Sequence, residues 1–454
     1  MRTKTDEVCA RGGNLLPAHA EKHIEFLDHV RGVAILLVFI FHGLLPAFGH
    51  DQLGWGGWVR SFSAPASFLA VLPATLGHIG VAIFFVVSGF CIHLSYERSS
   101  RNGYRDFFLR RFFRIYPVYV AALLLFALLD PSTRVDFSAS RGVLQFFSHL
   151  FLFHNFLDYR YFVGINGAFW SIAVEVQLYL IYPVLRWMVR RWGWAGALWI
   201  TGTMELTLRG VCGAFDIQQT ASWTWLFRLP FSFWFSWTLG ALLADQMLNR
   251  RPLCLARFPV SVWLGLMLVC WYVKPLFWFV FPVAALATTN VTAFLLTRPD
   301  VKPGLPRFVM EHIRLAGVMS YSIYLLHQPL LMRVPHLLEK FLPGLHFPPL
   351  AVYGICVLSW FLILIPCWLL HRYGEVPSID FGKWFIKKLA VGRLAGLSGE
   401  VVTATVFRRL REWNPLHSYL KWGVIFAILG TLISLASGLL LAIAVFVREV
   451  LLDN

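Results

Sequence analysis

Long apolar segments separated by short polar loops recur from one end of the chain to the other. A run of about 18 or more apolar residues with few charges is typical of a membrane-spanning helix. The pattern predicts an all-α, polytopic integral membrane protein, a bundle of ten transmembrane helices with a separated C-terminal eleventh. The expected spans are residues 31–49, 78–95, 114–129, 169–186, 193–209, 229–248, 258–273, 277–297, 317–332, 350–370 and 422–447.

The spans divide the chain into four regions. These are a cytoplasmic tail (1–23), a ten-helix transmembrane domain (24–371), a basic cytoplasmic or interfacial region (372–420) and an additional transmembrane helix (421–454). The basic region contains the amphipathic stretch KWFIKKLAVGRLAGL, which suits a membrane surface. Neither an appended soluble domain nor the internal repeat of an inverted-repeat transporter is expected.

The loop charges predict which side of the membrane each loop faces. If the amino terminus is cytoplasmic, 30 of the 40 Lys and Arg residues fall on the cytoplasmic side and 10 on the other. Cytoplasmic loops carry the excess of Lys and Arg in membrane proteins, so we predict this orientation. The net charge of +16 then reflects topology and contact with anionic lipids, and needs no nucleic-acid partner.

The composition agrees with a membrane protein and favours neither a disulfide framework nor a cysteine metal site. Hydrophobic residues make up 58% of the chain and charged residues 14%, against about a quarter charged in soluble domains. The first 25 residues are polar, so no cleavable signal peptide is expected. The seven cysteines are odd in number and lack CxxC spacing, which favours neither a disulfide framework nor a metal site.

The first span carries two ionisable residues, Arg31 and His42, at the ends of RGVAILLVFIFH. Eleven helical steps bring them to nearly the same face, about 16 Å apart along the axis. Singly, each has an ordinary interpretation, a buried histidine bonded to a neighbouring helix and an arginine that reaches the headgroups. Together, with Asp28 one turn earlier, they predict a functional helix face.

The fourth span, GAFWSIAVEVQLYLIYP, places Glu175 at about the depth predicted for His42. A carboxylate near an imidazole fixes the tautomer and raises its basicity, so the two could form a general-base pair. A polar clamp between helices is the alternative. Trp170, Ser171 and Tyr179 on this span could line a pocket or anchor the helix at the interface.

The loop after the second span is rich in arginine and contains no lysine. Arg110, Arg111 and Arg114 lie at i, i+1 and i+4 of a predicted helix. Guanidinium groups suit phosphate because they donate two parallel hydrogen bonds to it. The loop therefore predicts a phosphorylated ligand, with membrane anchoring as the alternative.

Two further stretches carry polar groups within apolar spans. GHIGVAIFFVVSGF places Ser88 among glycines that allow close approach of a helix or a ligand. SYSIYLLHQPL places Tyr324 and His327 one turn apart, as a pocket lining or a helix–helix hydrogen bond.

Taken in their order along the chain, these five stretches resemble the acyltransferase 3 family of integral membrane acyltransferases. The resemblance covers about residues 24–380 and includes HRYGEVP after the tenth span. It departs from the family pattern at Val176, where a second glutamate is common, and at His29, where a glycine often stands.

The resemblance implies transfer of an acyl group, usually acetyl from acetyl-CoA, to a hydroxyl of a cell-surface polysaccharide or lipid-linked glycan. It implies a catalytic role for Arg31, His42 and Glu175, and CoA binding by Arg31, Ser88 and the three loop arginines. Trp170, Ser171, Tyr179, Tyr324 and His327 are assigned to substrate binding. A bacterial inner membrane and glycan-assembly machinery as a partner are likewise implied.

The extended pantetheine arm of CoA is comparable in length to the Arg31–His42 rise. A thioester entering from the cytoplasm could thus reach His42, which would take the proton of the acceptor hydroxyl. The alternative from another class is a proton-coupled transporter or flippase of a glycan or lipid. The acceptor, the acyl chain length, a covalent acyl-histidine intermediate and the oligomeric state are left open by the sequence.

Overall fold

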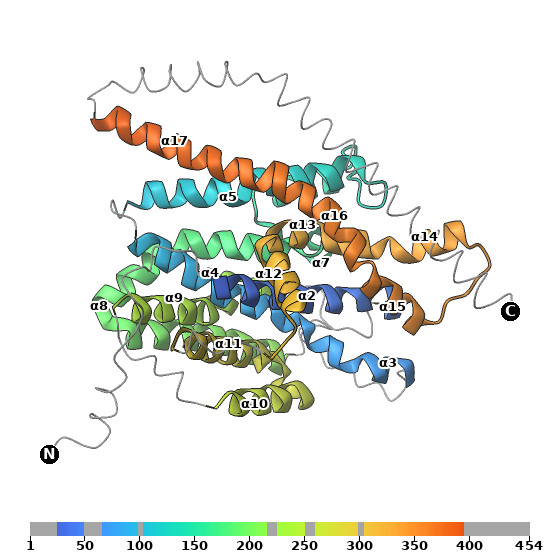
Figure 1. Ribbon diagram of the computed structural model, residues 1–454, viewed down its shortest axis with the longest axis horizontal. Helices are drawn as coiled ribbons and strands as arrows, with labels where there is room; N and C mark the ends of the chain where they lie inside the picture. Colours follow the sequence, from blue (N-terminus) through green and yellow to red (C-terminus); the bar gives the residue numbers. More distant parts are fainter. Residues whose placement is uncertain are drawn as a thin grey trace. The chain divides into compact units, whose positions relative to one another are not determined.

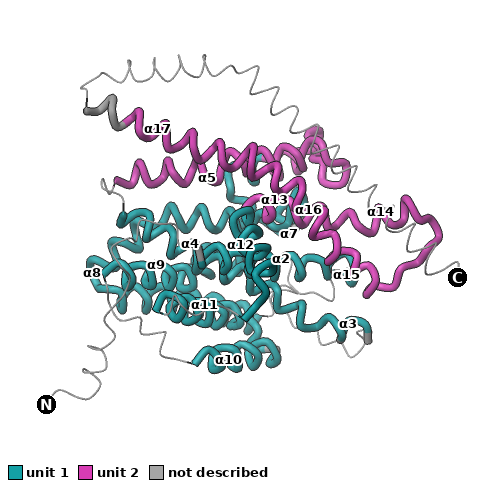
Figure 2. Tube along the Cα trace, in the orientation of Figure 1, with its two compact units in different colours: residues 1–102, 147–320 teal, residues 103–146, 321–454 magenta. Residues whose placement is uncertain are grey.

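The computed structural model describes residues 25–49, 66–98, 103–215, 225–249, 259–297 and 304–394. The predicted cytoplasmic tail, the end of the basic region and the eleventh helix lie outside these residues. Helices and turns make up the described part of the chain, which contains no strand. Figure 1 shows the helices, and Figure 2 shows the two compact units that the chain forms, each discontinuous in sequence.

Unit 1 comprises residues 1–102 and 147–320. Its described α-helices are α2 (Glu25–Phe48), α3 (Ala66–Val71), α4 (Gly80–Glu97), α7 (Tyr159–Phe162), α8 (Phe169–Ala214), α9 (Trp234–Leu248), α10 (Val260–Tyr272), α11 (Val280–Thr297) and α12 (Arg307–Val318). Short 3₁₀ segments join them: η2 (Leu72–Ile79), η4 (His154–Phe156), η6 (Leu226–Arg228), η7 (Pro230–Phe233) and η9 (Lys274–Phe279).

Unit 2 comprises residues 103–146 and 321–454. Its described helices are α5 (Tyr104–Leu124), α13 (Ser320–Met332), α14 (Val334–Phe341), α15 (Pro349–Leu358), α16 (Trp360–Leu370) and α17 (Val376–Leu394), with the π-helical turns η3 (Leu125–Leu129) and η10 (His371–Glu375). Helix α6 (Ser140–Leu150) crosses from the second unit into the first.

Six stretches of the described residues are long and apolar enough to cross a membrane. They are Phe26–Phe48, Leu72–Glu97, Tyr104–Leu129, Phe169–Ala214, Pro275–Thr297 and Pro349–Leu389. The all-helical membrane fold is therefore confirmed, while the number of ten spans plus one stays a prediction. Other predicted spans coincide with shorter helices such as α9, α10 and α13.

Helix α8 doubles back on itself at Gly193. This glycine has φ +69° and ψ 179°, a backbone conformation with positive φ that residues other than glycine rarely adopt. The arms on either side are about 36 and 32 Å long at 1.5 Å per residue, and each can span a bilayer. The bend brings the two ends of α8, near Trp170 and Arg209, to one cavity.

Glycines set how closely other helices approach α2. A Cβ at Gly80 would lie 2.4 Å from the carbonyl oxygen of Ala34, and one at Gly77 would lie 2.2 Å from that of Leu37. Only glycine permits such contact without displacing the backbone. The glycine motif predicted to allow close approach therefore packs η2 and the start of α4 directly on α2.

Glycines also allow α4 to pack closely on α9. A Cβ at Gly89 would lie 2.0 Å from the carbonyl oxygen of Trp237, and one at Gly240 would lie 1.9 Å from that of Val86. The two helices thus meet backbone to backbone. This places Ser88, beside Gly89, within reach of the Trp237 indole.

In unit 2, α17 packs along α5, and Figure 2 shows both in magenta. Gly382 faces the Phe113 side chain, and the Ser378 hydroxyl donates to the Phe113 carbonyl. Lys383, Lys387 and Lys388 are exposed on α17. The described part of the predicted basic region is therefore a helix with one face on α5 and basic groups on its exposed surface.

Candidate active site

His42 lies on α2 and is almost completely buried, with 2% of its surface exposed. Its Nδ1 lies 2.9 Å from the carbonyl oxygen of Val38, one turn earlier on the helix. A carbonyl can only accept, so Nδ1 carries the proton and the lone pair of the neutral ring is on Nε2. The helix thereby fixes the imidazole in one tautomer, as a general base requires.

Arg31, eleven residues earlier on α2, is held by two weak contacts. Its Nη1 lies 3.5 Å from Oδ1 of the buried Asp28, and its Nη2 donates to the Cys91 sulfur at 3.1 Å. A separation of 3.5 Å is at the long limit for a hydrogen bond, and a thiol is a weak acceptor. The Arg31 side chain is 17% exposed, and its guanidinium keeps hydrogen-bonding capacity for a ligand.

Three of the predicted site residues meet in one polar chain across three helices. The Tyr179 hydroxyl donates to Glu175 on α8, and it lies 3.3 Å from the Ser88 hydroxyl on α4. The Trp237 indole on α9 donates to the Ser88 oxygen at 3.3 Å. Glu175 thus receives its hydrogen bond from Tyr179, and the pairing of Glu175 with His42 stays a prediction.

Trp170 and Ser171 begin helix α8. The Ser171 hydroxyl donates to the Ala168 carbonyl at 3.4 Å, a local bond near the helix start. The Trp170 ring packs against Phe233 with centroids 5.4 Å apart. Of the two residues, Trp170 is the one that lines a cavity.

This cavity, which we call the aromatic cavity, has a volume of about 30 Å³ and lies within unit 1. Aromatic side chains form most of its wall, with one imidazole and one guanidinium among them. The lining residues are His78, Trp170, Arg209, Phe227, Phe233, Phe277, Trp278 and Phe281.

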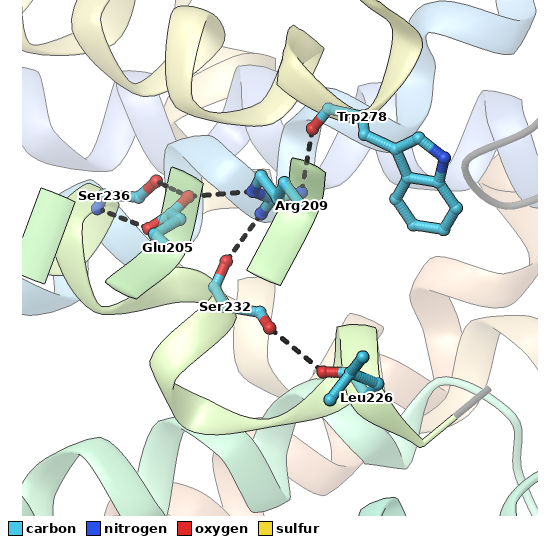
Figure 3. Close-up of polar contacts among 6 residues, drawn as sticks. All are labelled: Glu205, Arg209, Leu226, Ser232, Ser236 and Trp278. Carbon is cyan, nitrogen blue, oxygen red and sulfur yellow. Dashed lines mark hydrogen bonds and ion pairs between the residues drawn. The ribbon is translucent and has the colours of Figure 1, made fainter. Parts of the chain in front are cut away.

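A buried ion pair beside the aromatic cavity escaped the sequence analysis (Figure 3). Arg209 donates through Nε to Glu205 at 3.1 Å, through Nη1 to the Trp278 carbonyl at 3.1 Å and through Nη2 to the Ser232 carbonyl at 2.7 Å. Glu205 also accepts from the backbone and hydroxyl of Ser236, at 3.1 and 2.8 Å. The spacing of Glu205 and Arg209, four residues apart in an apolar run, was the signal available in the sequence.

The three arginines predicted to bind phosphate lie on α5 of unit 2. Arg110, Arg111 and Arg114 are all half-buried. Nη2 of Arg110 is buried and has no hydrogen-bond partner among the residues that the structure describes. A buried guanidinium nitrogen without a partner costs free energy, which an anionic ligand would recover.

Tyr324 and His327, also in unit 2, lie together on α13 with ring centroids 5.4 Å apart. His327 is fully buried, and its Nδ1 lies 2.9 Å from the Tyr324 carbonyl and 3.1 Å from that of Ile323. As in His42, the helix backbone fixes the tautomer. The two side chains form one buried polar pair, as their spacing predicts.

A buried carboxylate in unit 2, that of Glu375, was noted only as part of the sequence motif HRYGEVP. Glu375, in the π-helical turn η10, accepts from the Ser322 hydroxyl at 3.0 Å and from His371 Nδ1 at 2.9 Å. These bonds connect α13 to η10. Among the described residues, no group of three His, Cys, Asp or Glu side chains is placed to hold a metal ion.

Comparison with known proteins assigns the family. The acyltransferase domain of the acyltransferase 3 family matches residues 24–372, more than three quarters of the chain. The chain belongs to the acyltransferase 3 family. The matched range contains every predicted site residue of this acyltransferase 3 protein, including His42, Glu175 and the three arginines of α5.

Individual relatives match parts of the chain. Nodulation protein 10 of Rhizobium leguminosarum bv. viciae is 31% identical over 201 residues, 40% of this chain and 49% of that protein. The peptidoglycan O-acetyltransferase OatA of Listeria monocytogenes is 24% identical over 187 residues, 38% of this chain and 26% of OatA. BcsY of Komagataeibacter xylinus is 25% identical over 332 residues, 67% of this chain and 72% of BcsY.

The chain thus spans about half or less of the length of the first two of these relatives. No solved structure matches it. The features that the acyltransferase 3 resemblance does not include, the Glu205–Arg209 pair and the aromatic cavity, come from the structure alone.

Proposed function

We propose that this protein is a membrane O-acyltransferase that moves an acetyl group from cytoplasmic acetyl-CoA to a hydroxyl of a cell-surface polysaccharide or lipid-linked glycan. The family and the name of the Listeria relative support this reaction class. The loop charges support a cytoplasmic amino terminus, and a bacterial inner membrane is part of the proposal.

The observation that carries the proposal is the fixed tautomer of buried His42. Its Nε2 would take the proton of the acceptor hydroxyl as the hydroxyl oxygen attacks the thioester carbonyl. The new oxygen–carbon bond forms, the carbon–sulfur bond breaks, and the proton ends on the sulfur of CoA. Glu175 would stabilise the imidazolium that forms in between by its negative charge.

Arginines would bind the donor. In unit 2, Arg110, Arg111 and Arg114 would bind the phosphate groups of CoA, and the unpartnered Nη2 of Arg110 supports this role. In unit 1, the weak contacts of Arg31 suit a group that exchanges them for a ligand. Ser88 would assist donor binding from α4.

In unit 1, the acceptor would contact the residues of α8 that are predicted to bind substrate. Trp170 offers an aromatic face, while Ser171 and Tyr179 offer hydroxyl groups on the same helix. A sugar is recognised by such a mixture of stacking and hydrogen-bonding groups.

The test is purified protein with radiolabelled acetyl-CoA and an envelope glycan extract. We expect His42→Ala to lower transfer by about 10²–10⁴, the usual contribution of a general base. The matched control is His336→Ala, because His336 is exposed on α14. Thermal midpoints of both variants verify that they are folded.

Near-full transfer by folded His42→Ala would overturn the proposed role of the base. Movement of an unmodified glycan or lipid across vesicles, without ester formation by the wild type, would favour the transporter instead. Label on the glycan with the wild type, and its loss in His42→Ala, supports the acyltransferase.

A further inference from the structure

The size of the aromatic cavity restricts what can occupy it. Its volume is about 30 Å³. One water molecule needs about 10–15 Å³ of such space, so the cavity holds about two or three groups of water size. A methyl group with a carbonyl fits this space, whereas a sugar ring or a longer alkyl chain does not.

The wall of the cavity matches an apolar group that carries one oxygen. Phe227, Phe277 and Phe281 are among the aromatic side chains that would surround a methyl group. Arg209 faces the cavity and uses three of its five N–H groups in the bonds to Glu205 and two backbone carbonyls. Its two other N–H groups can donate to a carbonyl oxygen in the cavity.

Arg209 is positioned rigidly enough to orient such an oxygen. It is buried and bonded to three acceptors, and its guanidinium carbon lies 5.2 Å from the Phe233 ring centre and 4.9 Å from that of Phe281. Side chains that are held by several contacts place a donor accurately and lose little freedom when a ligand binds. Because the donor and the apolar wall are both fixed in position, the distance between them favours a ligand whose apolar group has one particular length.

The cavity adjoins the helix that carries His42. The Phe41 ring lies 5.4 Å from the His42 ring and 5.8 Å from that of His78, which lines the cavity. The segment with His78 packs directly on α2, because Gly77 lies against the Leu37 carbonyl. Trp170 lines the cavity from the start of α8.

We propose that the aromatic cavity receives the acyl group of the donor thioester, admits two carbons and rejects longer chains. Arg209 binds the carbonyl oxygen, and the aromatic wall encloses the methyl group. This inference rests on the proposed acyl transfer, and it assigns the chain-length limit to residues that the sequence did not single out.

The first test measures transfer from acetyl-, propionyl-, butyryl- and hexanoyl-CoA by the full chain. We expect the wild type to prefer acetyl over butyryl by at least about tenfold, the usual discrimination for added methylenes in a hydrophobic pocket. Phe277→Ala enlarges the cavity and should reduce that preference to about twofold or reverse it. The matched control, Phe279→Ala, alters the same 3₁₀ segment outside the cavity wall and should keep the wild-type profile.

Two further variants distinguish an effect of cavity size from a folding defect of Phe277→Ala. Phe277→Leu enlarges the cavity less and should give an intermediate profile. Phe277→Trp fills the cavity and should lower acetyl transfer at least about tenfold while the thermal midpoint remains near that of the wild type. An unchanged chain-length profile in the folded Phe277 variants would overturn the inference.

A second readout separates this inference from the proposed function. S-acetyl and S-butyryl pantetheine, which lack the nucleotide and its phosphates, are added without acceptor, and the thermal midpoint is recorded. Stabilisation of the wild type by the acetyl compound, and of Phe277→Ala by the butyryl compound as well, supports the pocket even if no transfer occurs. Transfer with no chain-length dependence overturns the pocket and leaves the acyltransferase intact. Absence of both binding and transfer overturns both.

Discussion

Two arginines of unit 1, Arg209 and Arg31, lie on long apolar helices and are held in opposite ways. Arg209 is buried and donates to Glu205 and to two backbone carbonyls at 2.7–3.1 Å. Arg31 is partly exposed and has a 3.5 Å contact with Asp28 and a bond to the Cys91 sulfur. The first arginine is held firmly by three hydrogen bonds, and the second is held only weakly.

The comparison shows that the surrounding fold can hold two charges on apolar helices to very different degrees. A buried charge must be paired and hydrogen-bonded to be tolerated, and Arg209 meets that condition through Glu205 and two backbone carbonyls. Arg31 meets it incompletely, which is the situation expected of a group that completes its bonds with a substrate. Substitutions at the two positions should therefore affect stability and donor binding differently.

The largest effect is expected when the Glu205–Arg209 pair is broken. Glu205→Ala leaves the Arg209 charge buried without its partner, which should lower the unfolding free energy by about 3–5 kcal/mol. Thermal unfolding in detergent measures the change. The control is Glu311→Ala, because the Glu311–Arg314 pair is exposed and its loss should cost less than about 1 kcal/mol. Equal midpoints for the two variants would show that Arg209 is not structural.

Arg31→Ala should have the opposite profile, with the fold retained and the donor bound weakly. Loss of charge-assisted hydrogen bonds of about 1.5–3 kcal/mol corresponds to a rise of about 10–100-fold in KM for the donor. Steady-state kinetics with varied acetyl-CoA measures it. Arg190→Ala, which removes an exposed arginine of α8, is the control. If Arg31→Ala lowered the thermal midpoint and left the KM for acetyl-CoA at the wild-type value, Arg31 would be structural as well.

The His154 imidazole differs from the two arginines in being a buried group that stays uncharged. It is fully buried and stacked on His149 with ring centroids 3.9 Å apart. Burial, and then the neighbouring His149, hold the pKa of His154 well below its ordinary value of 6.5. As pH falls through 6.5, the unfolded chain gains a proton that the folded protein does not, so stability present above pH 6.5 declines below it.

The expected slope is about 1.4 kcal/mol per pH unit between pH 6.5 and the lower folded-state pKa. Thermal midpoints recorded from pH 8 to 5 measure it. His154→Gln should flatten the decline, while His336→Gln, at an exposed histidine, should leave it unchanged. An identical decline in His154→Gln and the wild type would assign the acid sensitivity to other groups.

The smallest effect concerns the polar chain that holds Glu175. Tyr179→Phe removes the hydrogen bond to Glu175 and leaves the aromatic packing. A single such bond contributes about 0.5–1.5 kcal/mol, so transfer should fall about 2- to 10-fold with an unchanged midpoint. Tyr272→Phe, on the exposed surface of α10, is the control. A loss as large as that of His42→Ala would instead place Tyr179 in the proton transfer itself.

The sequence by itself determined the membrane class, the helical fold and the family. Apolar runs of sufficient length must be helical in a bilayer, because the backbone has to satisfy its own hydrogen bonds there. The pairing of Tyr324 with His327 also followed from spacing, since residues three apart lie on one helix face.

Only the tertiary structure decided which residues from distant segments meet. The contact of Ser88 with Tyr179 and Trp237 depends on the close approach of α4 and α9, and the aromatic cavity depends on the bend of α8 at Gly193. The firm hold on Arg209, in contrast to the weak hold on Arg31, depends on backbone carbonyls of η7 and η9. Helical periodicity specifies neighbours within one helix, whereas packing between helices determines which polar groups are satisfied, and that information is spread over the whole chain.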